Sequence, residues 1–155
     1  MDLEVQQVEI DVSDIMLMDI EDREVKLGDF KGRPVLLVGA GREGADEARK
    51  WGKELLVKCK EYQEVEYSRI AFVGKLPAFV PRKFIKGLLK SSSSASTPLI
   101  AWDNEPAEKL GVSDSKTPYI FMVDRDGILR FRFKGSYTGD NLEKITEYFS
   151  RVAGS

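Results

Sequence analysis

The chain has 155 residues and a mass of 17.5 kDa, with 42% apolar and 32% charged residues, which is typical of one soluble globular domain and excludes a disordered chain. It contains no histidine and one cysteine, Cys59, which excludes histidine-based acid–base or metal chemistry, an intramolecular disulfide and a cysteine-rich metal site. The net charge of −2 does not favour nucleic-acid binding.

The apolar runs and the first residues of the chain indicate where in the cell the protein is located. No apolar run approaches the roughly 18 residues that a membrane-spanning helix needs, so no transmembrane segment is predicted. The opening Met1-Asp2-Leu3-Glu4 is acidic, and no apolar stretch follows it to act as a signal peptide. The sequence as it stands therefore predicts a cytoplasmic protein. The alternative is a periplasmic protein from which an export signal has been removed.

The first part of the chain predicts extended structure. We expect a single domain over residues 1–155 that begins with an N-terminal extension over 1–14. Two extended stretches then flank Glu21-Asp22-Arg23, which predicts a β-hairpin. Residues 34–38 form an apolar run that begins with a proline and ends before Gly39, as expected of a strand buried on both faces.

A helix is predicted over residues 44–62, because acidic residues fill its first turn, basic residues fill its last, and apolar residues recur at helical spacing. Those apolar residues are Ala48, Trp51, Leu55, Cys59 and Tyr62. A strand over 65–73 follows. A strand–helix–strand unit of this kind forces parallel pairing of its two strands.

Residues 74–97 form a basic insertion, which consists of a helix over 81–90 and a Ser-rich loop over 91–97. Six lysines and arginines, and no Asp or Glu, lie between Tyr67 and Trp102. Two interpretations stay open. The helix presents a solvated face whose cations pair with acidic neighbours, or it contacts an anionic surface or partner. The cations concerned are Arg82, Lys83, Lys86 and Lys90.

The second half predicts strands over 99–102 and 119–123, with a short helix between them that is capped by Asn104. Asp124-Arg125-Asp126-Gly127 predicts a hairpin turn. The strand after it, over 129–134, alternates apolar and basic residues and so lies at or near a sheet edge.

A closing helix is predicted to start near Asp140, with Glu143 in a capping-box spacing. Because the hairpin forces antiparallel pairing, the predicted fold class is α/β with a mixed sheet and helices on both faces.

This order of elements resembles the thioredoxin fold, in particular its peroxiredoxin and bacterial membrane-anchored thioredoxin-like branch. The resemblance rests on the lead from Leu27 to Val38, on the runs 108–112 and 117–127, and on the closing helix. The chain is most similar to the YtfJ-type bacterial family, in which the strand also leads into Ala-Gly-Arg, here Ala40-Gly41-Arg42, and a Pro-rich basic insertion follows. That family is periplasmic in many bacteria and has no established activity.

The resemblance implies a thioredoxin-like, three-layer α/β/α domain with a mixed central sheet and an N-terminal β-hairpin extension. It also implies that Pro118 is a cis proline beside the functional face. The sequence departs from the redox members at one place. They carry CxxC or a peroxidatic cysteine where the first helix begins, and here residues 41–47 contain no sulfur. Disulfide exchange at that place is therefore impossible.

These observations predict a non-redox binding or interaction module that holds an unknown peptide, protein or small anion. The predicted binding residues lie at the start of the first helix and in the proline loop: Ala40, Gly41, Arg42, Glu43, Gly44, Thr117 and Pro118. No catalytic residue, metal or cofactor is predicted. The sequence favours a non-enzymatic role without deciding the matter, since it has no CxxC, no peroxidatic cysteine and no histidine.

Two alternatives stay open. A thiol-dependent redox protein would act through Cys59, although that residue shares an apolar helix face with Trp51 and Leu55, as a buried, inert cysteine does. Residues 39–44 also match GxGxxG after a strand, which indicates dinucleotide or anion binding at a helix start. Against that, the acidic residue expected after the next strand is absent, and Glu43, Asp46 and Glu47 already supply negative charge to this helix start.

Overall fold

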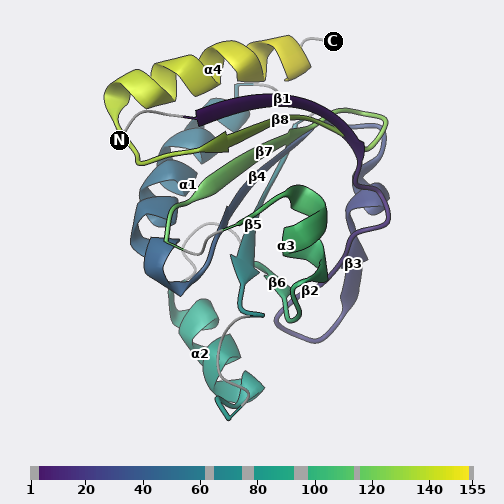
Figure 1. Ribbon diagram of the computed structural model, residues 1–155, viewed down its shortest axis with the longest axis vertical. Coiled ribbons are helices and arrows are strands. Elements are labelled where there is room, and N and C mark those ends of the chain that lie inside the picture. Colours follow the sequence, from purple (N-terminus) through teal and green to yellow (C-terminus); the bar gives the residue numbers. More distant parts are fainter. Residues whose placement is uncertain (1–3, 62–64, 75–78, 93–97, 114–115, 154–155) are drawn as a thin grey trace.

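An eight-stranded mixed sheet runs through the molecule in the order β1-β8-β7-β4-β5-β6-β2-β3 (Figure 1). The computed structural model describes residues 4–61, 65–74, 79–92, 98–113 and 116–153. The strands are β1 (Glu4–Asp11), β2 (Met16–Met18), β3 (Glu24–Lys26), β4 (Val35–Ala40), β5 (Glu66–Phe72), β6 (Leu99–Ala101), β7 (Tyr119–Val123) and β8 (Ile128–Lys134).

Strands β4, β5 and β6 pair in parallel, and the other neighbouring strands pair antiparallel. The parallel pair arises because α1 (Ala45–Cys59) carries the chain from the end of β4 back to the start of β5. Tight turns produce the β2–β3 and β7–β8 hairpins. The predicted mixed sheet and both predicted hairpins are therefore confirmed.

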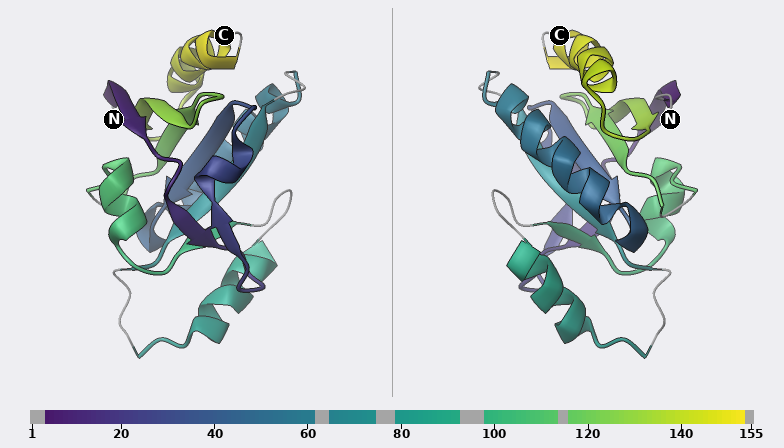
Figure 2. Two further views of the ribbon diagram at one scale, coloured as in Figure 1. Left: turned by 90° about the vertical axis from the view of Figure 1, so that its right-hand side faces the viewer. Right: turned by 90° about the vertical axis from the view of Figure 1, so that its left-hand side faces the viewer.

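Helices cover both faces of the sheet and divide the core into two clusters (Figures 1 and 2). On one face, α1 and α4 (Gly139–Ala153) bury Trp51, Leu55, Ile145 and Phe149 against Leu36 and its neighbours. On the other face, α3 (Glu105–Leu110) and the 3-10 helix η1 (Leu27–Phe30) pack on a second cluster. Strand β4 is buried on both faces, as its apolar sequence predicts.

The basic insertion forms α2 (Arg82–Ser92), which extends beyond the sheet and away from the other helices (Figures 1 and 2). Its contacts with the rest of the described chain include the following. Lys86 forms an ion pair with Asp22 at 2.5 Å, the Arg82 guanidinium lies 4.6 Å from the centre of the Trp102 ring, and Ile85 is buried. Most of the predicted Ser-rich loop, residues 93–97, lies outside the described residues.

Residues 4–11 of the predicted extension form β1, which pairs with β8 at the edge of the sheet, so β8 lies near an edge as predicted. Two predicted details are wrong. The side chain of Asn104 does not cap α3, because the Asp103 carboxylate accepts the Glu105 N–H at 3.0 Å instead. The hydroxyl of Thr138, rather than Asp140 with Glu143, accepts an N–H of the first turn of α4.

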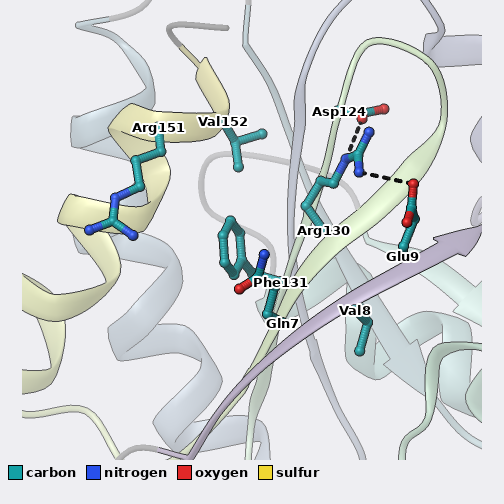
Figure 3. Close-up of a pocket in the computed structure, with 8 residues that line it drawn as sticks. All are labelled: Gln7, Val8, Glu9, Asp124, Arg130, Phe131, Arg151 and Val152. Atoms are coloured by element: carbon teal, nitrogen blue, oxygen red, sulfur yellow. Dashed lines mark hydrogen bonds and ion pairs between the residues drawn. The ribbon is translucent and has the colours of Figure 1, made fainter.

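An open groove of about 660 Å³ lies between β1, β8 and the end of α4 (Figure 3). Three of its four charged side chains, Glu9, Asp124 and Arg130, bind one another. Arg130 donates to Asp124 at 2.7 Å and to Glu9 at 3.4 Å, and Arg151 points away from them. These three side chains therefore form an ion-pair network that connects β1, β8 and the β7–β8 turn, and they are not available to a ligand.

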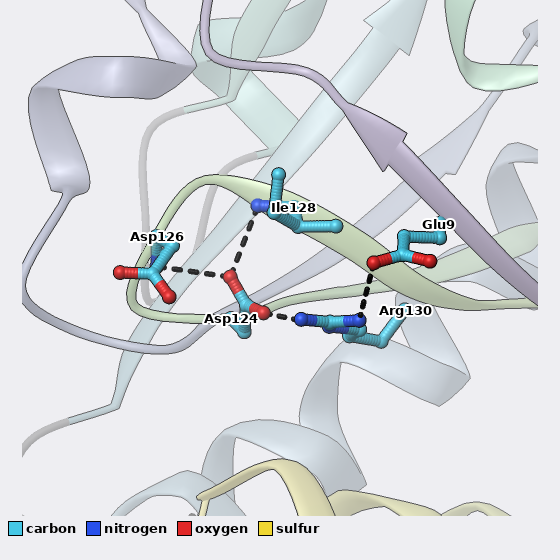
Figure 4. Close-up of polar contacts among 5 residues, drawn as sticks. All are labelled: Glu9, Asp124, Asp126, Ile128 and Arg130. Atoms are coloured by element: carbon cyan, nitrogen blue, oxygen red, sulfur yellow. Dashed lines mark hydrogen bonds and ion pairs between the residues drawn. The ribbon is translucent and has the colours of Figure 1, made fainter.

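The Asp124 carboxylate is the centre of that ion-pair network (Figure 4). It also accepts the N–H groups of Asp126 at 2.9 Å and Ile128 at 3.0 Å. Burial by itself raises the pKa of Asp124, but the hydrogen bonds from Ile128, Arg130 and Asp126 outweigh burial and hold the pKa below its ordinary value. The ionised carboxylate therefore stabilises the fold.

We expect Asp124→Asn to lower the free energy of unfolding by about 1–2 kcal/mol at neutral pH, because the charge-assisted bond to Arg130 is lost. The folded-state pKa is depressed, so this stabilisation is complete above the ordinary carboxyl pKa of about 4 and is lost as the pH falls through the lower folded value. Urea unfolding at several pH values tests this. The variant and the parent should converge in acid, and a gap that persists there would contradict the assignment. Asp126→Asn, at an exposed carboxylate, is the control.

Candidate functional site

The end of β4 lies between β5 and β7, and both strands contribute to the surroundings of the predicted site. Gly39 pairs with Tyr119 of β7 on one side, and Ala40 pairs with Ala71 of β5 on the other. The chain then makes one 3-10 turn, η2 (Arg42–Gly44), before α1 begins. The predicted residues 40–44 therefore emerge between the proline loop and the end of β5.

On the β7 side, the predicted residues pack directly on one another. A Cβ atom at Gly44 would lie 3.2 Å from the carbonyl oxygen of Lys116 and 3.3 Å from the nitrogen of Pro118. Both neighbours are backbone atoms, so glycine permits this approach and a larger side chain would displace the loop. The structure thus brings Gly44 against residues 116–118, as predicted. Backbone atoms of the two segments are in contact there, so no space for a ligand lies between them.

The expected cis proline is not observed. No cis peptide bond occurs in the described part of the chain, so the Thr117–Pro118 bond is trans. A trans X–Pro bond is the lower-energy form by about 0.5–1 kcal/mol unless its surroundings select the other. Here the loop is already held by its packing on Gly44 and by a 3.4 Å hydrogen bond from the Gly135 N–H to the Pro118 carbonyl.

On the β5 side, a pocket of about 390 Å³ opens between η2, the start of α1, the end of β5 and the inner face of α2. We call it the α1–α2 pocket. Its lining is apolar except for two arginines, and none of the described lining residues carries a carboxylate. The lining consists of Ala40, Gly41, Arg42, Ala45, Arg49, Ala71, Phe72, Val73, Ile85, Leu88 and Leu89.

A smaller hollow of about 80 Å³ continues the α1–α2 pocket along the sheet. The two share Ala40, Ala45, Arg49, Ala71 and Leu89, and the smaller one adds Arg69 from β5. Together they run from solvent, past the start of α1, to the sheet beneath Arg49.

The charges around the α1–α2 pocket are mainly positive. Arg42 is exposed and forms no ion pair with any described residue, whereas Arg49 is paired with Asp46. Burial lowers the pKa of Arg69, its contact with Tyr67 opposes that effect, and the nearby Arg49 lowers it further. Arg49 and Arg69 both line the smaller hollow, so an anion between these arginines would be stabilised.

The start of α1 adds to this field. Neither Gly41 nor Gly44 supplies a side-chain cap. The carboxylate of Glu47 instead accepts the Tyr137 N–H at 2.9 Å, and so serves the loop before α4. Asp46 pairs with Arg49, so neither carboxylate of the first turn caps the first amides of α1, although both supply the negative charge that the sequence places there.

The predicted site residues thus separate into two groups. Ala40, Gly41 and Arg42 line the α1–α2 pocket, while Glu43, Thr117 and Pro118 do not. The prediction missed the wall that α2 and the end of β5 provide. The apolar face of the basic helix, with Ile85 and Leu89 one turn apart, was the available signal.

Packing within the protein accounts for two glycines of the GxGxxG motif. A Cβ atom at Gly39 would lie 2.5 Å from Cε2 of the Phe72 ring, and Gly44 faces residues 116–118. Both positions therefore need glycine whether or not a pyrophosphate binds, which removes the specific support for the dinucleotide hypothesis.

Cys59 is the last residue of α1, at the opposite end of the helix from η2. A 15-residue helix spans about 22 Å at 1.5 Å per residue, so this cysteine is remote from the α1–α2 pocket. The placement of its thiol lies outside what the structure describes.

Comparison with known proteins identifies the fold. No protein-family model matches the chain, and no curated protein matches it by sequence. Several solved structures are similar over nearly the whole chain. One, described as a thiol:disulfide interchange protein DsbE from Chlorobium tepidum, has a TM-score of 0.72 at 15% identity and covers 97% of this chain and 99% of its own.

A protein described as a disulfide isomerase from Bacteroides thetaiotaomicron has a TM-score of 0.68 at 14% identity, over 100% of this chain and 96% of its own. The exposed lipoprotein thioredoxin Etrx1 of Streptococcus pneumoniae has a TM-score of 0.65 at 16% identity, over 87% of this chain and 98% of its own. These likenesses, together with the strand order and the helices on both faces, show that the chain has a thioredoxin-like fold.

Proposed function

We propose that this chain is a non-redox binding protein of thioredoxin-like fold whose ligand occupies the α1–α2 pocket. The observation that carries the proposal is the pocket itself. An apolar hollow with arginines at its mouth lies beside the start of α1. Pockets of a few hundred Å³ with an apolar lining and a few polar groups are the usual form of small-ligand sites.

The lining defines the chemistry of the ligand. Nine apolar or glycine residues favour an aliphatic or aromatic group, and Arg42 and Arg49 favour an anionic end. A peptide that ends in an apolar residue with its carboxylate, or a small organic acid, satisfies both requirements. Inorganic phosphate satisfies only the second.

A redox role has less support. The similar solved structures belong to proteins described as disulfide interchange or isomerase proteins, and such exchange needs a thiolate at the reacting site. Here the start of α1 has no cysteine, and Cys59 is the only sulfur nucleophile in the sequence. We therefore retain the Cys59 hypothesis only as a second candidate, to be tested by the rate of thiol labelling in the folded protein.

We also propose that the protein is of the YtfJ type and works in the bacterial periplasm. The support is the Ala40-Gly41-Arg42 run at the end of β4 and the basic insertion. Two of the similar structures add to it, since one is described as an exposed lipoprotein and another as a secreted isomerase from Corynebacterium glutamicum.

We expect octanoate, used as a probe of an apolar chain with a carboxylate, to raise the melting temperature by about 5–10 °C at a hundred times its dissociation constant. Ala45→Leu should abolish the shift, because Ala45 is exposed at the mouth of the pocket and a larger side chain would fill it. Ala107→Leu on α3 is the control. Gly44 is unsuited to this test, since a side chain there meets the backbone of Lys116.

The same assay should include glutathione, an apolar tripeptide, NAD and inorganic phosphate. A shift with the tripeptide that Ala45→Leu removes also supports the pocket. A shift with NAD alone would favour the dinucleotide hypothesis. If no probe shifts the melting temperature, or if Ala45→Leu leaves every shift unchanged, the proposed site is wrong.

Arg42→Gln should weaken octanoate binding about tenfold, because it removes the exposed guanidinium at the mouth, and should leave the melting temperature of the free protein unchanged. Lys50→Gln, on the exposed side of α1 and outside the pocket lining, makes the same change in net charge and is the matched control. Equal losses in the two variants would show a general charge effect rather than a contact at Arg42. Isothermal titration calorimetry distinguishes these outcomes.

A further inference from the structure

The outer face of α2 exposes large apolar side chains. Phe84 is 60% exposed and Leu88, one turn further on, is 55% exposed. Phe79, just before the helix, is 84% exposed. Side chains four residues apart lie next to each other on a helix, so Phe84 and Leu88 form one apolar surface. We call these three residues the outer apolar face.

This exposure results from how α2 is held. Ile85 is buried and lines the α1–α2 pocket, so the inner side of the helix faces the protein. The Lys86–Asp22 ion pair and the stacking of Arg82 on Trp102 fix the rotation of the helix about its axis. With the inner side so fixed, Phe84 points to solvent, and Leu88 is exposed at the rim of the α1–α2 pocket.

Positive charge borders the outer apolar face. Arg82 and Lys83 are exposed, and the sequence contains no Asp or Glu between Tyr67 and Trp102. Asp22 pairs with Lys86, and Asp103 and Glu105 line a hollow together with Arg82, which leaves Lys83 as the cation beside Phe84. Charge complementarity therefore selects an anionic partner for this face.

The shape of the region indicates which anionic partner. In Figures 1 and 2, α2 protrudes from the body of the protein, so its outer side is convex. A convex helix with exposed Phe and Leu beside Lys and Arg fits the boundary of a bilayer, where apolar side chains enter the acyl region and cations meet phosphates. None of the described helices is long and apolar enough to cross a membrane.

We propose that the outer apolar face of α2 binds the surface of an anionic lipid bilayer. Lys83 attracts the headgroups, and Phe79, Phe84 and Leu88 enter the interface. The binding is peripheral. It does not require a ligand in the α1–α2 pocket, although Leu88 at the rim of that pocket belongs to both surfaces.

The test is sedimentation with vesicles of phosphatidylglycerol and phosphatidylcholine in equal amounts, compared with vesicles of phosphatidylcholine alone. We expect binding to the anionic vesicles at low salt, and about tenfold weaker binding when Phe79 and Phe84, which lie outside the lining of the α1–α2 pocket, are both changed to Ser. Lys83→Glu should weaken binding by a similar factor at low salt and have less effect at high salt, where charges are screened.

Val57→Ser is the matched control, because Val57 on α1 is also 55% exposed but lies outside the outer apolar face. All variants change exposed side chains and should keep the melting temperature of the parent. The proposal is overturned if neither vesicle binds at low salt, or if Val57→Ser loses as much binding as the double variant. Self-association that the double variant abolishes, without vesicle binding, would assign this face to a second copy of the chain instead.

Discussion

The close backbone contact at the end of β4 is the constraint on which the site depends. Gly39 leaves room for the ring of Phe72, and Gly44 leaves room for the Lys116 carbonyl. Because protein atoms fill both spaces, a side chain at either position would displace the path that the chain takes between β4 and α1. That path places Ala40, Gly41 and Arg42 toward β5 and α2, and so determines on which side of the helix start the α1–α2 pocket opens.

Redox members of this fold use the start of the first helix to stabilise a thiolate. In this chain the same helix start has no thiol, but groups that favour a bound anion are still present there. The first amides of α1 lack side-chain caps, Arg42 is exposed, and burial together with Arg49 lowers the pKa of Arg69. A positive field beside an apolar hollow favours amphiphilic anions over both neutral ligands and bare phosphate. The ligand that we propose for the α1–α2 pocket would use this positive charge together with the apolar lining.

The sequence predicts those elements whose pattern is local. The apolar runs of β4 and β7, the helical spacing on α1 and α4 and both hairpin turns depend on neighbouring residues, and all were confirmed. Strand β1 was missed because its pairing with β8 shifts register between Gln7 and Ile10, which breaks the alternation that identifies a strand. A second shift, at Met122, puts Leu129 on the opposite face from Phe131 and Phe133. The wall of the pocket was missed because the docking of α2 depends on contacts far apart in sequence, such as Lys86 with Asp22.

Helix α2 explains why a basic segment occurs in an acidic chain. Of its described cations, Lys86 and Arg82 make contacts within the protein, so part of the charge has a structural role, as one interpretation of the sequence expected. These contacts also fix which side of α2 faces the pocket. The same rotation that brings Ile85 and Leu89 to the pocket must turn Phe84 outward, because residues 84 and 85 differ by about 100° around a helix of 3.6 residues per turn. The wall of the α1–α2 pocket and the outer apolar face are therefore consequences of one set of contacts.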